Sequence, residues 1–145
     1  MPCMSRPFDP SIGPLFDVVI VPHGQAQSTF VRDNSAEVVP LQLQSNSLLV
    51  DTGADNTCIS PSVAADVGLV PVGVRAVHRA TGAAYHNQYL IDLVIPFGNT
   101  LFIVPNLPVI EVVSSSPHFE GLLGRDVVCQ GHLSVSWDNT YKFCL

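Results

Sequence analysis

The chain has 145 residues, which is enough for one domain that buries roughly 70% of the surface its unfolded form exposes. Hydrophobic residues make up 47% and charged residues only 12% of the sequence, which excludes intrinsic disorder and leaves room for a partner subunit to cover part of the surface. The net charge of -6, with six Lys and Arg in total, leaves no basic stripe for a phosphate backbone, so nucleic acid is excluded as an expected ligand.

Membrane and metal-binding signals are missing from the sequence as well. No apolar run approaches the roughly 20 residues that span a bilayer, and residues 1–14 lack a basic start followed by an apolar stretch. The four cysteines lie far apart and form no Cys-x-x-Cys pair, and the five His are scattered. We therefore expect a cytoplasmic protein with reduced thiols, no metal, no cofactor and no membrane partner.

The first half of the chain predicts strands that lead to an acidic residue. Residues 1–36 are read as an N-terminal extension, either an added strand or an arm, and residues 37–145 as the main domain. Runs of β-branched or alternating apolar residues predict strands at 15–21, 37–44 and 47–50. The strand predicted at 47–50 ends directly before Asp51.

A short helix is predicted over residues 60–68. Ser60 can cap its first turn, Pro61 suits the first helical position, and Gly68 allows the chain to leave.

The second half of the chain predicts further strands at close spacing. Residues 72–79 and 88–96 form a long hairpin around the small residues 80–84, in which Gly82 permits a tight turn. Additional strands are expected at 100–104, 133–137 and 141–145. Together these elements indicate an all-β domain, barrel-like or built of folded-over sheets, with one or two short helices.

Two short segments carry the chemical signal. Leu48-Leu49-Val50-Asp51-Thr52-Gly53 places a carboxylate after an apolar strand, followed by a hydroxyl and a glycine that permits a sharp turn. Asp-Thr-Gly alone is weak evidence, because most such turns are structural. The second segment, Gly121-Leu122-Leu123-Gly124-Arg125-Asp126, strengthens the first.

The two segments, with the hairpin between them and a strand at the end, resemble the retropepsin-like aspartic proteases, and the match covers about residues 39–145. The resemblance implies an all-β half-barrel with a flap hairpin, working as a homodimer on a peptide or protein substrate. Asp51, Thr52 and Gly53 would form the catalytic turn. One Asp51 from each subunit would make a pair that shares one proton and activates a water, without metal or cofactor.

The same resemblance assigns roles to residues around this turn. Ala54 and Asp55 would contact substrate from beside it, and Thr81, Gly82 and Ala83 from the tip of the flap. Leu122, Leu123 and Gly124 would support the turn from below. Arg125 would hold Asp55 with two parallel hydrogen bonds. The C-terminal strand at 141–145 would add to a sheet shared by the two subunits.

Two alternatives from another class remain. The chain could be a catalytically silent retropepsin-like module that serves dimerisation or peptide binding, because fold does not guarantee chemistry. A generic β-barrel that binds a small apolar ligand is the other, and it leaves the two segments unexplained.

Overall fold

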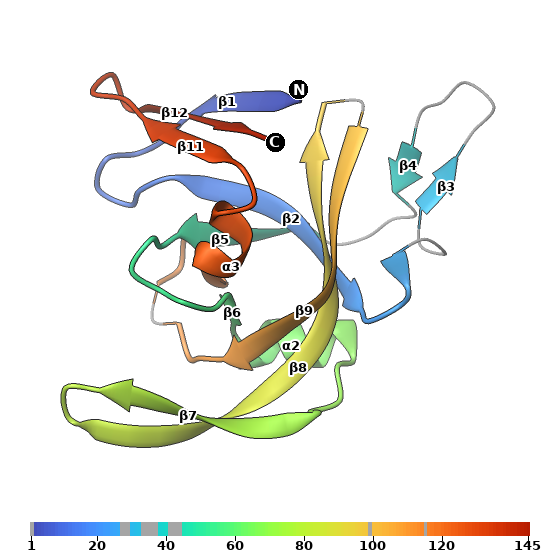
Figure 1. The fold of residues 1–145 in the computed structure, drawn as a ribbon, viewed down its shortest axis with the longest axis vertical. Coiled ribbons are helices and arrows are strands. Elements are labelled where there is room, and N and C mark those ends of the chain that lie inside the picture. The colour runs from blue at the N-terminus through green and yellow to red at the C-terminus, as the bar shows by residue number, and fades with distance from the viewer. Residues whose placement is uncertain (1, 27–29, 33–37, 41–44, 99, 115) are drawn as a thin grey trace.

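The structure is a computed structural model that describes residues 2–26, 30–32, 38–40, 45–98, 100–114 and 116–145. A seven-stranded sheet in the order β2-β5-β10-β6-β9-β8-β7 closes on itself, because β2 also pairs with β8, so six of its strands form a barrel and β7 lies outside the ring (Figure 1). Its strands are β2 (Leu15–Pro22), β5 (Ser45–Val50), β6 (Cys58–Ile59), β7 (Gly73–Arg79), β8 (Gly82–Phe97), β9 (Thr100–Glu111) and β10 (Gly121–Leu123). The prediction of a barrel-like all-β domain with short helices is confirmed.

The chain termini form a second, three-stranded sheet above the barrel. It has the order β1-β12-β11, with β1 (Cys3–Pro7) and β11 (His132–Val135) antiparallel to the central strand β12 (Thr140–Cys144). Both edges of β12 are therefore occupied within its own chain. β12 itself has no free edge, and the expectation that the C-terminal strand adds to a sheet shared by two subunits stays a prediction.

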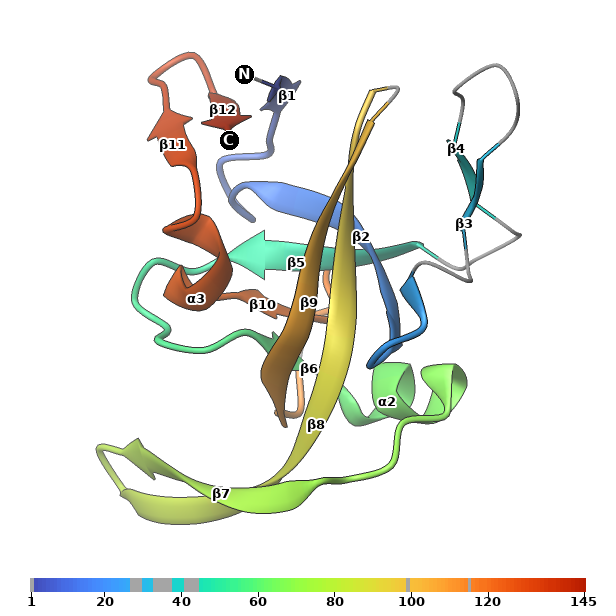
Figure 2. The same cartoon turned by 45° about the vertical axis from the view of Figure 1, so that its right-hand side comes forward.

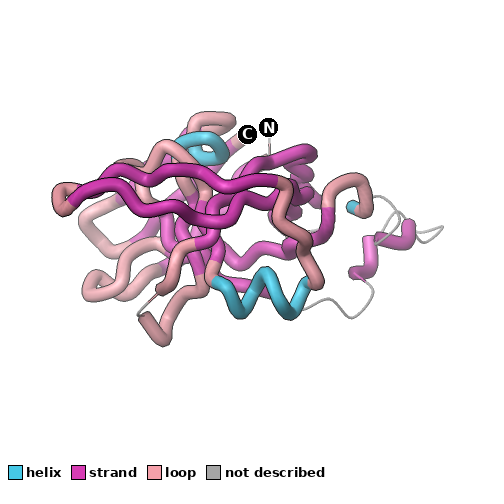
Figure 3. The backbone as a smooth tube through the Cα atoms, turned by 90° about the horizontal axis from the view of Figure 1, so that it is seen from below, coloured by secondary structure: helices cyan, strands magenta, loops and turns pink. Residues whose placement is uncertain are grey.

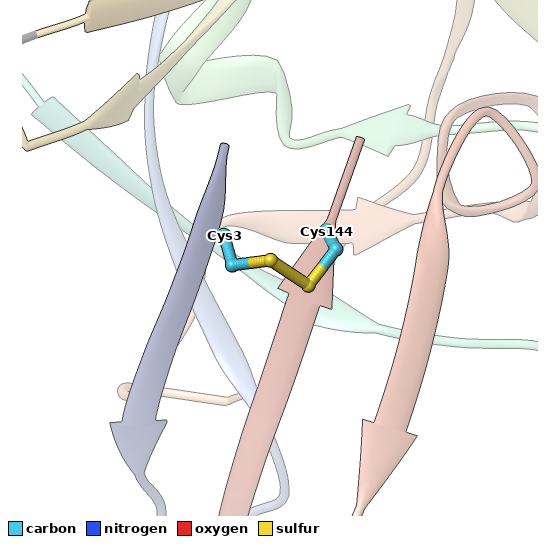
Figure 4. The surroundings of a disulfide bond; sticks show 2 residues. All are labelled: Cys3 and Cys144. Carbon is cyan, nitrogen blue, oxygen red and sulfur yellow. A yellow bond between two sulfur atoms is a disulfide. The ribbon is translucent and has the colours of Figure 1, made fainter. Parts of the chain in front are cut away.

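A disulfide joins Cys3 of β1 to Cys144 of β12, which face each other in the strand register (Figure 4). The prediction of four reduced thiols is thus wrong for these two cysteines. Cys58 and Cys129 are free. The pairing could not be read from spacing, because only the fold brings two residues 141 positions apart together.

Aromatic side chains connect the terminal sheet to the barrel. The ring of Phe16 in β2 stacks on that of Tyr141 at a centroid distance of 5.4 Å and meets the edge of Phe143 at 5.3 Å. All three side chains are buried, and the Tyr141 hydroxyl donates a hydrogen bond to the Leu15 carbonyl. The two sheets consequently share one hydrophobic core.

The helix predicted at 60–68 is confirmed as α2 (Pro61–Val67). The Ser60 hydroxyl accepts from the Val63 N–H, and Gly68 ends the helix at φ 75°, a left-handed conformation that favours glycine. A second short helix, α3 (Arg125–Val128), follows β10. In the part of the chain that the structure describes, no helix is long or apolar enough to cross a membrane.

The predicted hairpin is formed by β7 and the first part of β8, and Gly82 lies at its turn with φ 123°. Figure 3 shows the two strands running together away from the barrel to a short turn. The second part of β8 continues into the barrel between β9 and β2. This one strand therefore connects the hairpin to the core.

The N-terminal residues supply two strands, β1 and β2, which pair with β12, β5 and β8. The proposed division into residues 1–36 and 37–145 stays a prediction. Of the strand expected at 37–44, only β4 (Val38–Pro40) is described, paired with β3 (Phe30–Arg32), and the remainder lies outside the described residues.

Candidate active site

The Asp-Thr-Gly segment forms a closed turn at the end of β5. The Asp51 N–H donates to the Leu123 carbonyl at 3.0 Å, which fixes where the strand ends, and the Ala54 N–H returns to the Asp51 carbonyl at 3.2 Å. The Gly53 N–H donates to Oδ1 of Asp51 at 2.9 Å. This bond orients the carboxylate, while Thr52 and Gly53 remain exposed.

Gly53 lies close to the Asp51 side chain. A Cβ atom there would lie 3.2 Å from Oδ1 of Asp51, tighter than ordinary van der Waals contact. A side chain at this position would fit only if the Asp51 carboxylate moved by a few tenths of an ångström.

Strand β10, which carries Leu122 and Leu123, lies beside both ends of this turn, and their supporting role stays a prediction. It lies between β5, to which it is parallel, and β6, to which it is antiparallel, with Leu123 beside Val50 and Leu122 beside both Leu49 and Cys58. Because β10 pairs with both β5 and β6, it holds the two ends of the turn between them.

Gly124 passes very close to the backbone of the turn. A Cβ atom at Gly124 would lie 2.5 Å from the carbonyl carbon of Asn56 and 2.9 Å from the nitrogen of Thr57. Backbone atoms cannot move aside as a flexible side chain can, so this crossing needs glycine.

Thr57 and Asp126 form a buried link that the sequence analysis did not assign. The Thr57 hydroxyl donates to Oδ1 of Asp126 at 2.7 Å and accepts from the Gly124 N–H at 3.1 Å, while the Thr57 N–H donates to Oδ2 at 2.9 Å. Thr57 is fully buried. The sequence signal for this link is Asp126, an acid in the first turn of the helix after Leu-Leu-Gly, because a carboxylate at such a position accepts hydrogen bonds from backbone N–H groups.

The expected ion pair between Arg125 and Asp55 is present, with Nη2 of Arg125 against Oδ1 of Asp55. Both side chains are more than half exposed, so the pair contributes at most about 1 kcal/mol. That the guanidinium holds this carboxylate with two parallel hydrogen bonds stays a prediction. The Arg125 N–H adds a bond to the Ala54 carbonyl at 2.9 Å.

Cys58 is partly buried behind the turn. Its pKa is raised to about 11, first by burial and then by the negative charges of Asp126 and Asp51. The thiol is therefore protonated at neutral pH and unsuited to nucleophilic attack. With Val112, Phe119 and Leu122 it lines an apolar groove of about 190 Å³.

The hairpin tip lies on the same side of the molecule as the active-site turn. In Figures 1 and 2 the loop between β5 and β6 and the free end of the β7–β8 hairpin project to the same side. Thr81, Gly82 and Ala83 at the tip are exposed. Among the described residues, no hydrogen bond or ion pair joins the tip to the 51–57 loop, so contact of these three residues with substrate stays a prediction.

Comparison with known proteins agrees with this arrangement. Residues 42–127 match the family model described as aspartyl protease. The fold is similar to a retropepsin-like aspartic protease from Rickettsia conorii, with a TM-score of 0.61 at 10% sequence identity, over 97% of this chain and 89% of that one. A search among curated proteins finds no match.

Proposed function

We propose, from the premise that this chain belongs to the retropepsin-like aspartyl protease family, that it is an aspartic endopeptidase active as a homodimer. The observation that carries the proposal is the Asp51 turn. Its carboxylate accepts the Gly53 N–H at 2.9 Å and stays partly exposed at the end of β5.

The need for two subunits follows from the count of such turns. Asp-Thr-Gly occurs once in the 145 residues, whereas the chemistry uses two adjacent carboxylates. Two close carboxylates resist double ionisation, so the pair shares one proton and offers a base and an acid together. The second carboxylate is then Asp51 of the partner subunit.

In the proposed reaction, the unprotonated Asp51 takes a proton from a water held between the two carboxylates. The water oxygen attacks the carbonyl carbon of the scissile peptide bond as that proton leaves, and the C–N bond then breaks as Asp51 gives the proton to the departing amine nitrogen. The protonated Asp51 of the partner subunit donates a hydrogen bond to the carbonyl oxygen, where negative charge develops. Thr52 would position the turn at the subunit contact.

An extended peptide is the substrate that this site suits. Gly53, which has no side chain, leaves room for a peptide backbone and offers its own carbonyl as an acceptor. The partly buried Ala54 and the exposed Asp55 continue the same edge of the turn. The β7–β8 hairpin would cover the peptide from the other side and exclude water, which strengthens every polar interaction beneath it.

A mixed peptide library tests the proposal. Products would be identified by mass, from mildly acid to alkaline pH, for the wild type, Asp51→Asn and the control Asp66→Asn, whose carboxylate is exposed on α2. We expect cleavage by the wild type and the control, none by Asp51→Asn, and a rate that falls at alkaline pH as the shared proton is lost. Equal cleavage by all three proteins would contradict the proposal. A folded wild-type dimer that cleaves nothing would favour the silent binding module.

A further inference from the structure

The terminal sheet carries an apolar face that continues beyond the body of the molecule. Residues directly opposed in an antiparallel pair share a face, and Leu133 and Val135 of β11 oppose Phe143 and Tyr141 of β12. Phe143 and Tyr141 are buried and Leu133 packs against the core, yet Val135 is 54% exposed. The apolar face of this sheet is therefore exposed to solvent at Val135.

Trp137, two residues further on, is 96% exposed and is the only tryptophan in the chain. Its turn is ordered by local bonds: the Ser136 N–H donates to the Thr140 carbonyl at 2.8 Å, and the Thr140 N–H donates to Oδ1 of Asp138 at 3.1 Å. A large aromatic group on an ordered turn loses little conformational freedom when a partner covers it. Tryptophan is also among the residues that most often dominate binding energy at interfaces.

This exposed strip lies on the side of the molecule that carries the catalytic turn. Strand β11 is an edge strand, because β12 fills the centre of the terminal sheet and β1 its other edge. Figures 1 and 2 show β11 and its turn on the same side as the loop after β5 and the tip of the β7–β8 hairpin. A second copy of the chain that docks against β11 would therefore cover the side of the molecule on which the two Asp51 carboxylates must come together.

We propose that Val135, Trp137 and the free edge of β11 form the surface on which a second copy of this chain docks. The inference rests on the proposed two-subunit function, because a site with one Asp51 is incomplete without that copy. A two-fold contact places the same patch on both subunits, so an edge strand can pair with its own counterpart while the two apolar strips cover each other.

The single tryptophan makes the docking directly observable. Sedimentation velocity and tryptophan emission would be followed together as the concentration of the wild-type chain is raised. We expect the emission to move to shorter wavelength with the same midpoint as dimer formation. A dimer whose emission is unchanged, or a chain that stays monomeric at every concentration, would overturn the inference.

Substitutions then test the residues themselves. Trp137→Ala should raise the dimer dissociation constant by at least about thirty-fold, and Val135→Ser should raise it by a smaller factor. Val70→Ser is the matched control, since Val70 is 78% exposed after α2 and should leave the dimer unchanged. If Trp137→Ala dimerises as the wild type does while cleavage still depends on Asp51, the surface is wrong and the proposed function stands. If Trp137→Ala loses cleavage and a higher protein concentration restores it, the docking surface and the proposed function are both supported.

Discussion

At the scale of a single residue, Thr57 links the Asp51 turn to the helix α3. Its hydroxyl is both donor to Asp126 and acceptor from the Gly124 N–H, and no water reaches it. Removing that hydroxyl would leave a buried N–H and a carboxylate oxygen without partners, which is more costly than never having formed the bonds.

We therefore expect Thr57→Val to lower the free energy of unfolding by about 3 kcal/mol. Thr57→Ser, which keeps the hydroxyl, should lose much less and serves as the control. Urea unfolding followed by circular dichroism measures both. Equal loss in the two variants would mean that the methyl group of Thr57, and not its hydroxyl, carries the effect.

Cys58 gives a prediction that depends on pH. Because its pKa is raised to about 11, its reactive thiolate is scarce at neutral pH. Iodoacetamide should therefore modify the exposed Cys129 first and reach Cys58 only as the pH approaches that value, as peptide mapping by mass would show. Equally fast labelling of both thiols at neutral pH would contradict this environment.

The same shift has a consequence for stability, whose sign follows from the raised pKa. In the unfolded chain Cys58 ionises near its ordinary pKa of 9.0, whereas in the folded chain it stays protonated up to about 11. The contribution of the protonated Cys58 thiol to the free energy of unfolding is therefore complete below the pKa of 9.0. It is lost as the pH rises from 9.0 to about 11.

At the scale of elements, β10 and the start of α3 brace the 51–57 turn through backbone contacts. Gly124→Ala would place a methyl group against the backbone of residues 56 and 57. We expect a loss of about 3 kcal/mol in unfolding free energy, at the upper end of overpacking effects, and a loss of cleavage. Gly98→Ala is a useful control, because no atom lies near its added Cβ although its φ of 58° brings some strain. A Gly124→Ala protein that keeps wild-type stability and cleavage would rule out the brace.

Local signals were sufficient to predict some elements before the structure was known. Helix α2 was predictable because Ser60, Pro61 and Gly68 each act within one turn of the chain. The turn after β5 and the position of the two leucines in β10 were predictable because their residue types match a family pattern, while their roles stay predictions. The pairing of Arg125 with Asp55 followed from that pattern and is present.

Other elements depend on tertiary contacts and were predicted incompletely. Strand β8 begins at Gly82, six residues before the predicted start, because its small and polar first part is held by pairing with β7. Strand β9 continues past Pro105, where a strand end was expected. There a bulge shifts the register opposite Asp92, and that buried carboxylate accepts the Asn106 N–H at 3.1 Å. Neither contact is visible in local sequence.

For the whole molecule, the Cys3–Cys144 disulfide ties the two ends of the chain together. It closes a loop with a sequence separation of 141, so it restricts the unfolded chain strongly. Cys3→Ser should lower the free energy of unfolding by about 2–4 kcal/mol. Cys129→Ser, at an exposed free thiol, should leave it unchanged.

Unfolding in urea with and without a reductant provides the measurement. Reductant should destabilise the wild type but not Cys3→Ser, and a wild type that is insensitive to reductant would contradict the bond's contribution. Disulfides persist in oxidising compartments, so this bond argues against the cytoplasmic location predicted from sequence, which stays a prediction.

The central claim is that each active site contains one Asp51 from each of two identical subunits. Mixing the wild type with an equal amount of Asp51→Asn, under conditions where subunits exchange, tests it most directly. If both carboxylates are needed, random pairing places half of the wild-type subunits in inactive mixed dimers, so cleavage per wild-type subunit should fall to about half. Cleavage per wild-type subunit that is unchanged by the mutant, in mixtures shown to contain mixed dimers, would contradict the shared site.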